Sequence, residues 1–156
     1  IHGYKSRHQL ASLCRRQDRV AEAESLWREA VAERPDFVPA WLGLAELYLS
    51  MGREAELAAE VARLESAAST REAAQVVRAR LHLARRELTA ACALLEEAVR
   101  SSPPALWARL FLGQVLVQEG RDRAAAVRVL REVLALDPHQ PEARRLLALL
   151  GKAGGS

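Results

Sequence analysis

Residues 41–48 read WLGLAELY, and this stretch decides the fold. Its large side chains, Trp41, Leu44 and Tyr48, follow the three- and four-residue spacing of one helix face, and small Ala45 lets a second helix approach closely. Only 4% of the chain is aromatic, and its common residues, Ala, Leu, Arg and Glu, are strong helix formers. The sequence therefore predicts an all-α protein of paired helices.

Small residues recur on both sides of this stretch at steps of 34 residues. They are Ala11, Ala45, Ala79 and Gly113, and Leu precedes three of them, as Leu10, Leu44 and Leu112. Pro35 and Pro103 lie two such steps apart, and so do Gly52 and Gly120. A period of this length indicates stacked helical repeats, because one repeat alone cannot bury its apolar face.

The period and its residue types resemble the tetratricopeptide repeat (TPR), whose pattern is W-x-x-L-G-x-x-Y, then A-x-x-x-F, then P. The repeats are expected at about 4–37, 38–71, 72–105 and 106–140, with a capping helix at about 141–150 and a flexible tail at 151–156. The last repeat holds one extra residue, which we place in the turn at 121–125. The resemblance implies that residues 1–150 form a single TPR α-solenoid of nine helices, in antiparallel pairs wound into a right-handed superhelix.

The repeat register also predicts which residues are buried between helices. They are Trp27, Trp41, Leu44, Ala45, Tyr48, Ala79, Leu95, Gly113 and Leu130. Cys14, His82 and Cys92 stand at packing positions and are interpreted as packed side chains. Where Ser69 replaces the usual Pro, Ser69 and Glu72 match a capping box that can start the next helix.

A second stripe of side chains runs along the first helix of each repeat, at i, i+4 and i+7. Its middle residue is polar or charged in every repeat, and its outer two are aliphatic in the last three. With Trp107, the predicted groove residues are His8, Ser12, Arg15, Leu42, Glu46, Leu49, Val76, Arg80, Leu83, Leu110, Gln114 and Val117. In the TPR family this face resembles the lining of a concave groove, which implies a protein or peptide partner. The alternative is that these aliphatic residues only complete the packing of neighbouring helices.

Catalytic signatures are missing from the sequence. No HExxH, P-loop, GxSxG or GxGxxG motif occurs, and Cys14 and Cys92 form no CxxC pair. We therefore predict that this stretch of chain is not an enzyme and holds no cofactor or metal. The 23 basic residues are interleaved with 20 acidic ones, which argues against nucleic acid and leaves an RNA-binding repeat as a remote alternative. The chain has no Asn, which argues against the carboxylate clamp of TPR chaperone adaptors.

No apolar run approaches 18 residues and no signal peptide is visible, so we expect a cytoplasmic protein that does not enter a membrane. The chain begins at Ile1 rather than Met, as a piece of a longer protein would. Residues 3–11, GYKSRHQLA, and 36–44, DFVPAWLGL, resemble the TPR region that follows a family-2-type glycosyltransferase domain in some bacterial proteins. This resemblance implies, as an alternative function, an accessory domain that positions an acceptor or a partner. The partner's identity and the oligomeric state stay open.

Overall fold

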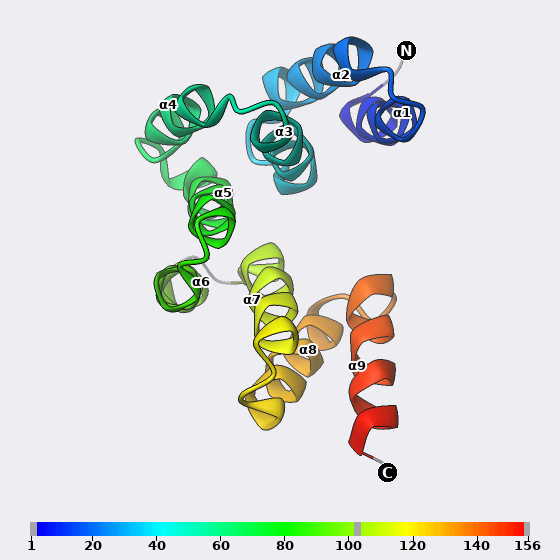
Figure 1. The fold of residues 1–156 in the computed structure, drawn as a ribbon, viewed down its shortest axis with the longest axis vertical. Helices are drawn as coiled ribbons and strands as arrows, with labels where there is room; N and C mark the ends of the chain where they lie inside the picture. The colour runs from blue at the N-terminus through cyan, green and yellow to red at the C-terminus, as the bar shows by residue number, and fades with distance from the viewer. Residues whose placement is uncertain (1–2, 102–103, 155–156) are drawn as a thin grey trace.

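A computed structural model describes residues 3–101 and 104–154 of the chain. Within these residues the protein consists of nine α-helices and one short 3-10 turn, Ala68–Thr70, with no strand (Figure 1). The helices are α1 (Tyr4–Arg16), α2 (Val20–Glu33), α3 (Val38–Ser50), α4 (Glu54–Leu64), α5 (Arg71–Ala84), α6 (Leu88–Ser101), α7 (Leu106–Glu119), α8 (Arg123–Leu136) and α9 (Pro141–Gly154). The predicted all-α class is confirmed.

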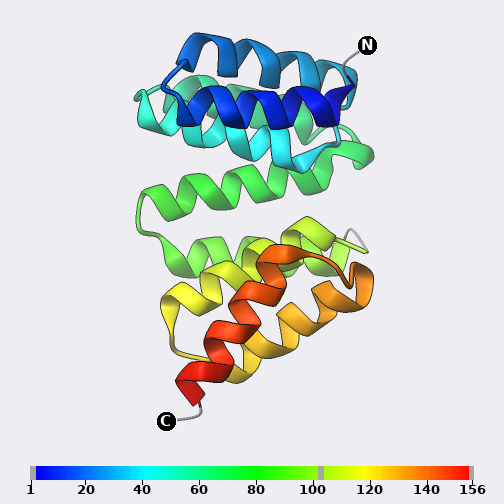
Figure 2. The same ribbon diagram turned by 90° about the vertical axis from the view of Figure 1, so that its right-hand side faces the viewer.

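The helices form a curved stack in which each odd-numbered helix contacts the next odd-numbered one. In Figure 1 the stack has the shape of a C. The helices α1, α3, α5, α7 and α9 lie along its inside, and the even-numbered helices form its outer layer. Figure 2 shows the same stack from its open side, with the two termini at opposite ends. The inner helices therefore supply the concave surface.

Every residue of the predicted core is buried, which confirms the register. Small residues are required where helices touch. A Cβ atom on Gly43 would lie 2.3 Å from the ring of Trp27, and one on Gly113 would lie 2.6 Å from the side chain of Leu130. In α4 the buried Leu57 stands where the sequence pattern has a small residue, and α3 and α4 form the most loosely packed of the four pairs.

The inner helices end in one repeated turn. Asp18, Gly52, Arg86 and Gly120, again 34 residues apart, adopt left-handed conformations with φ values of 62°, 69°, 62° and 70°. The first three turns each close with a hydrogen bond from the next residue's amide to a carbonyl near the helix end, as Arg53 does to Tyr48 at 2.9 Å. The fourth turn is longer, and Asp122 caps α8 there by accepting from the amide of Ala125 at 2.9 Å. The extra residue of the last repeat lies in this turn.

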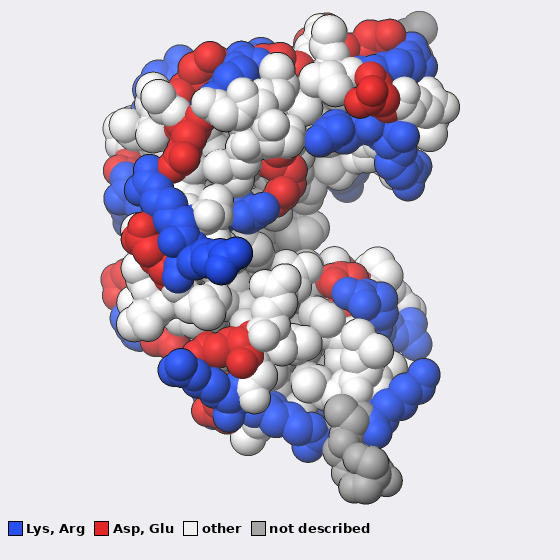
Figure 3. Space-filling model, in the orientation of Figure 1, with Lys and Arg blue, Asp and Glu red and all other residues white. Residues whose placement is uncertain are grey.

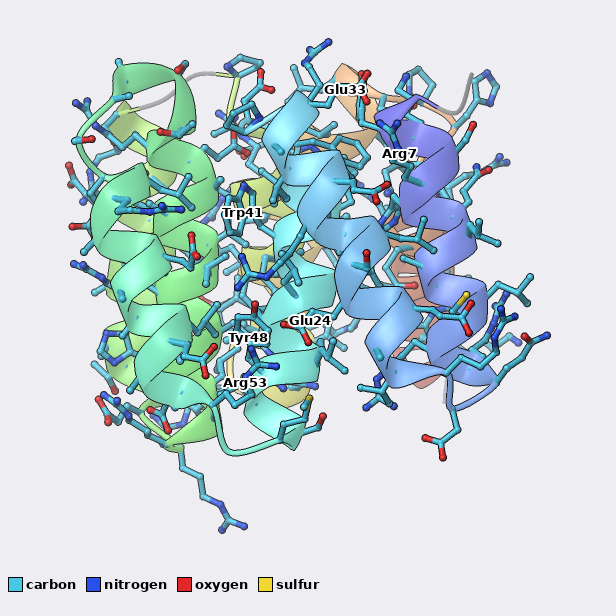
Figure 4. The ribbon with its side chains drawn as sticks, turned by 90° about the horizontal axis from the view of Figure 1, so that it is seen from above. Arg7, Glu24, Glu33, Trp41, Tyr48 and Arg53 are labelled. Carbon is cyan, nitrogen blue, oxygen red and sulfur yellow. The ribbon has the colours of Figure 1, made fainter. Side chains whose placement is uncertain are left out.

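A polar cluster joins α2, α3 and the start of α4 (Figure 4). Arg53 donates two hydrogen bonds of 2.9 Å to the carboxylate of Glu24, and the hydroxyl of Tyr48 donates to the same carboxylate at 3.2 Å. The Arg53 guanidinium also lies 4.3 Å from the centre of the Tyr48 ring. The hydrogen bond from Arg53 holds the pKa of Glu24 below its usual value, so the pair stays charged at neutral pH.

The predicted capping box at α5 is wrong. Ser69 is exposed, and the 3-10 turn before α5 is held instead by Thr70, whose hydroxyl donates to the carbonyl of Leu64 at 2.6 Å. Glu72 points away from its own helix start, and its carboxylate accepts from the backbone amides of Trp107 and Ala108. Glu72 therefore caps α7, the first helix of the following repeat. Ala105, the residue before α7, has no polar side chain that could do so.

Two further expectations need correction. The helix α9 runs through Gly154, beyond the expected end near residue 150, because Lys152 and Ala153 favour helix. Cys14 is buried as predicted, whereas Cys92 and His82 are only half-buried. The ring of His82 reaches Glu87, with Nδ1 2.9 Å from the carboxylate. Pro103, which the repeat pattern used, lies outside the described residues.

Candidate interaction surface

The inside of the C is an open hollow bounded by side chains of the inner helices (Figure 3). A large pocket in this hollow, of about 620 Å³, is lined by residues of α3, α5, α7 and α9 and of the turn into α6. Leu83, Phe111 and Val117 give it an apolar wall. Two ion pairs, Glu46 with Arg80 and Glu142 with Arg145, lie on its polar edge. The surface thus offers apolar contact area beside fixed charges, which suits a peptide.

A second pocket, of about 360 Å³, is lined by residues of α1, of the start of α3 and of the start of α7. Phe37 and Trp107 supply aromatic surface, and Lys5 supplies a positive charge. His8 is held in place here: its Nδ1 accepts from Trp27 Nε1 at 3.0 Å, and its ring packs edge-on against Phe37. Burial lowers the pKa of His8, so the ring is neutral at physiological pH.

The structure distributes the predicted groove residues over several places. Glu46, Arg80, Leu83, Gln114 and Val117 line the large pocket, and His8 and Trp107 line the second one. Ser12, Arg15, Leu42 and Leu49 are half-buried on α1 and α3, outside both pockets. Val76 and Leu110 have exposed fractions of 0% and 6%, so they belong to the core rather than to the groove surface.

Sequence reasoning missed how the polar groove residues are used. Arg80 and Glu46 were expected as separate contacts for a partner, but they bind each other across the two helices. Arg15 donates to the hydroxyl of Ser50 at 3.3 Å. Arg86, which was not predicted, lines the large pocket. The 34-residue period could have found it, because position 86 lies midway between Gly52 and Gly120.

In residues 3–101 and 104–154 no three His, Cys, Asp or Glu side chains gather as a metal site would require. In the same ranges no helix is both long enough and apolar enough to span a bilayer.

The class of protein follows from the helix pairs, their 34-residue period and the concave surface. The profile of the tetratricopeptide repeat family matches residues 15–81 and 82–150, and the chain belongs to this family. TPR domains are helical scaffolds for other proteins, and this stretch of chain is therefore a scaffold rather than an enzyme.

A curated relative is the cellulose synthase operon protein C of Xanthomonas axonopodis pv. citri (strain 306). It is 34% identical over 142 residues, which cover 85% of this chain but only 9% of that protein. The chain thus spans less than a tenth of that relative's length.

Solved TPR structures share the fold. TTC0263 of Thermus thermophilus is 24% identical with a TM-score of 0.58, and the match covers 98% of this chain and 84% of that one. YrrB, described as a TPR protein with an unusual peptide-binding site, is 15% identical with a TM-score of 0.52, covering 96% and 77%. PilW, a type IV pilus biogenesis factor, is 21% identical with a TM-score of 0.54, covering 97% and 71%.

Proposed function

We propose that residues 1–150 act as one TPR array that binds an extended peptide or a helix of a partner protein on the concave surface. The observation that carries this proposal is the pocket of about 620 Å³ on the inner helices, with an apolar wall and paired charges at its edge. An extended segment can place alternate side chains in such pockets. The description of YrrB as a peptide-binding TPR protein supports the idea by analogy.

A random library of 12-residue peptides, displayed on phage and selected on the purified chain, tests the proposal directly. The double variant Leu49→Ser, Leu83→Ser removes two half-buried aliphatic side chains from the inner helices. The control is Val127→Ser, an equally half-buried aliphatic residue in a shallow depression formed by α8. Helical circular dichroism is recorded for all three proteins to verify that they are folded.

We expect the selected peptides to bind the wild-type and Val127→Ser chains alike and the double variant at least tenfold more weakly. The proposal is overturned if the double variant folds and binds them as well as the wild type.

A second candidate is an accessory role in bacterial polysaccharide synthesis, in which the array positions a sugar acceptor or a synthase partner. The relative named for a cellulose synthase operon favours it, and so does the aromatic pocket of Phe37 and Trp107, since sugars stack on aromatic rings. Calorimetric titration with cellohexaose tests acceptor binding. Heat that disappears in Trp107→Phe, Phe37→Leu would support it, and no heat with the wild type would rule out the acceptor role.

We also propose that the protein is cytoplasmic and that it does not bind nucleic acid. Cys14 and Cys92 are free thiols, which fits a reducing cytoplasm. Many arginines are paired with glutamates, as in the cluster around Glu24, so their charge is compensated locally. An electrophoretic shift of a 30-nucleotide RNA at moderate salt would contradict this part.

A further inference from the structure

The four turns that end the inner helices share one backbone geometry but differ in residue type. Two of the left-handed positions are Gly52 and Gly120, which have no Cβ and adopt this conformation freely. Asp18 is tolerated there because a short polar side chain relieves some of the cost. Arg86, with φ of 62°, is the exception: a long side chain stands where glycine would be more stable.

Strained positions of this kind concentrate at functional sites, where the side chain is needed for another purpose. Arg86 is exposed and lines the large pocket together with Leu83, Leu88 and Phe111. Arg86 therefore stands beside an apolar wall at the edge of the surface proposed to bind a partner.

The charges around this pocket leave Arg86 uncompensated. Three arginines and two glutamates line it. Arg80 is paired with Glu46, and Arg145 is paired with Glu142, whose pKa is lowered mainly by that arginine. Among the described residues Arg86 makes no ion pair, and the neighbouring Glu87 reaches His82 instead.

We propose that Arg86 is a binding residue for a carboxylate of the partner, and that the bound segment carries an acidic residue next to a large apolar one. This inference rests on the proposed function and adds the chemistry of the ligand. The apolar side chain fills the pocket against Leu83 and Phe111, and the carboxylate forms a two-pronged hydrogen-bonded pair with the guanidinium. One unpaired guanidinium matches the single charge of a carboxylate better than the nearly double charge of a phosphate.

The peptide selection described above provides the probes. Peptides whose binding depends on the inner helices are synthesised and titrated by fluorescence anisotropy against Arg86→Asn, Arg86→Lys and the control Arg131→Gln. Arg131 lies in the α8 depression, away from the inner pocket. Asn removes the charge but tolerates the left-handed conformation, so this variant folds with the same turn.

We expect an acidic residue adjacent to Leu, Ile, Phe or Met to be enriched among these peptides. Arg86→Asn should weaken their binding at least tenfold, Arg86→Lys less, and Arg131→Gln not at all. Changing the acidic residue of a peptide to its amide should weaken binding to the wild type by the same factor. The same change should leave binding to Arg86→Asn unaltered.

A second measurement separates binding from folding. Arg86→Gly relieves the strained turn, so we expect a higher melting temperature together with the same loss of peptide binding. A merely structural arginine would give the opposite result, a lower melting temperature and unchanged affinity. Peptides that need the inner helices but lack acidic residues, or that bind Arg86→Asn normally, overturn this inference and leave the proposed function standing. A selection without any peptide that depends on the inner helices overturns both.

Discussion

The carboxylate of Glu72 on α5 lies 2.9 Å from the backbone nitrogen of Trp107, at the start of α7. A second hydrogen bond of 3.1 Å joins the same oxygen to the amide of Ala108. Both amides are among the first of their helix and have no partner within it. The negative charge also faces the positive end of the α7 dipole. One side chain thus fastens two neighbouring repeats, although burial raises its pKa and opposes its charge.

Replacing Glu72 separates capping from charge. We expect Glu72→Ala to lower the free energy of unfolding by about 1–2 kcal/mol, as the loss of a helix cap does. Glu72→Gln keeps an oxygen acceptor for the two amides and should cost clearly less. Urea unfolding followed by circular dichroism measures both. Equal losses in the two variants would contradict capping by the acceptor oxygen.

Gly43 tests how closely α3 approaches α2. Alanine favours a helix interior over glycine by about 1 kcal/mol, so an uncrowded site would be stabilised. At Gly43 the new Cβ would lie 2.3 Å from the rigid Trp27 ring, and overpacking of about 1–3 kcal/mol should outweigh that gain. Gly43→Ala should therefore melt earlier than the wild type. Gly151→Ala, in open space on α9, is the matched control and should melt later or unchanged.

His8 should make stability depend on pH. Its pKa is lowered in the folded state by burial, so the unfolded chain binds a proton more readily. The contribution of neutral His8 to the free energy of unfolding is present above the pKa of the unfolded chain, near 6.5. It is lost as the pH falls through the lower pKa of the folded state. We expect wild type to lose stability between pH 7 and pH 5 relative to His8→Gln, which keeps an acceptor for Trp27. Parallel urea curves at both pH values for the two proteins measure the difference, and an unchanged difference would show that His8 does not titrate.

Trp107 should contribute to stability as well as to the surface. Its ring is half-buried and packs against both clusters of the core. Trp107→Ala should therefore cost about 2–3 kcal/mol, less than a fully buried Trp would. Leu149→Ala, at a residue with an exposed fraction of 46%, should change stability by less than about 0.5 kcal/mol. Guanidinium unfolding of both variants provides the comparison, and equal midpoints would place the Trp107 ring outside the core.

Helix pairing, period and core could be predicted from the sequence, because each depends on local spacing. The small residues at 11, 45, 79 and 113 mark close contacts within helix pairs, and their spacing can be read without knowing any contact between distant parts of the chain. The position of the extra residue followed from the break in that period. These features need only neighbouring repeats to be alike.

The details of the surface could not be predicted in the same way, because they depend on distances between repeats. Val76 occupies the same repeat position as Leu42, yet Val76 is completely buried and Leu42 only partly. Glu72 matched a local capping motif, but α7 offered its carboxylate unpaired amides. Arg80 reached Glu46 because residues 34 apart stand side by side on adjacent inner helices.

The two clusters of the core meet at Trp107, and the one nearer the C-terminus is much the smaller. In a stack whose elements touch only their neighbours, the stability of each part depends on the surface that it buries against those neighbours. Helix α9 buries side chains only in the smaller cluster, through Ala143 and Leu146, so we expect it to detach before the larger cluster unfolds. The large pocket uses Glu142, Arg145 and Leu146 of α9 as one wall. Detachment of α9 would therefore remove that wall and weaken the hold of the pocket on a bound segment.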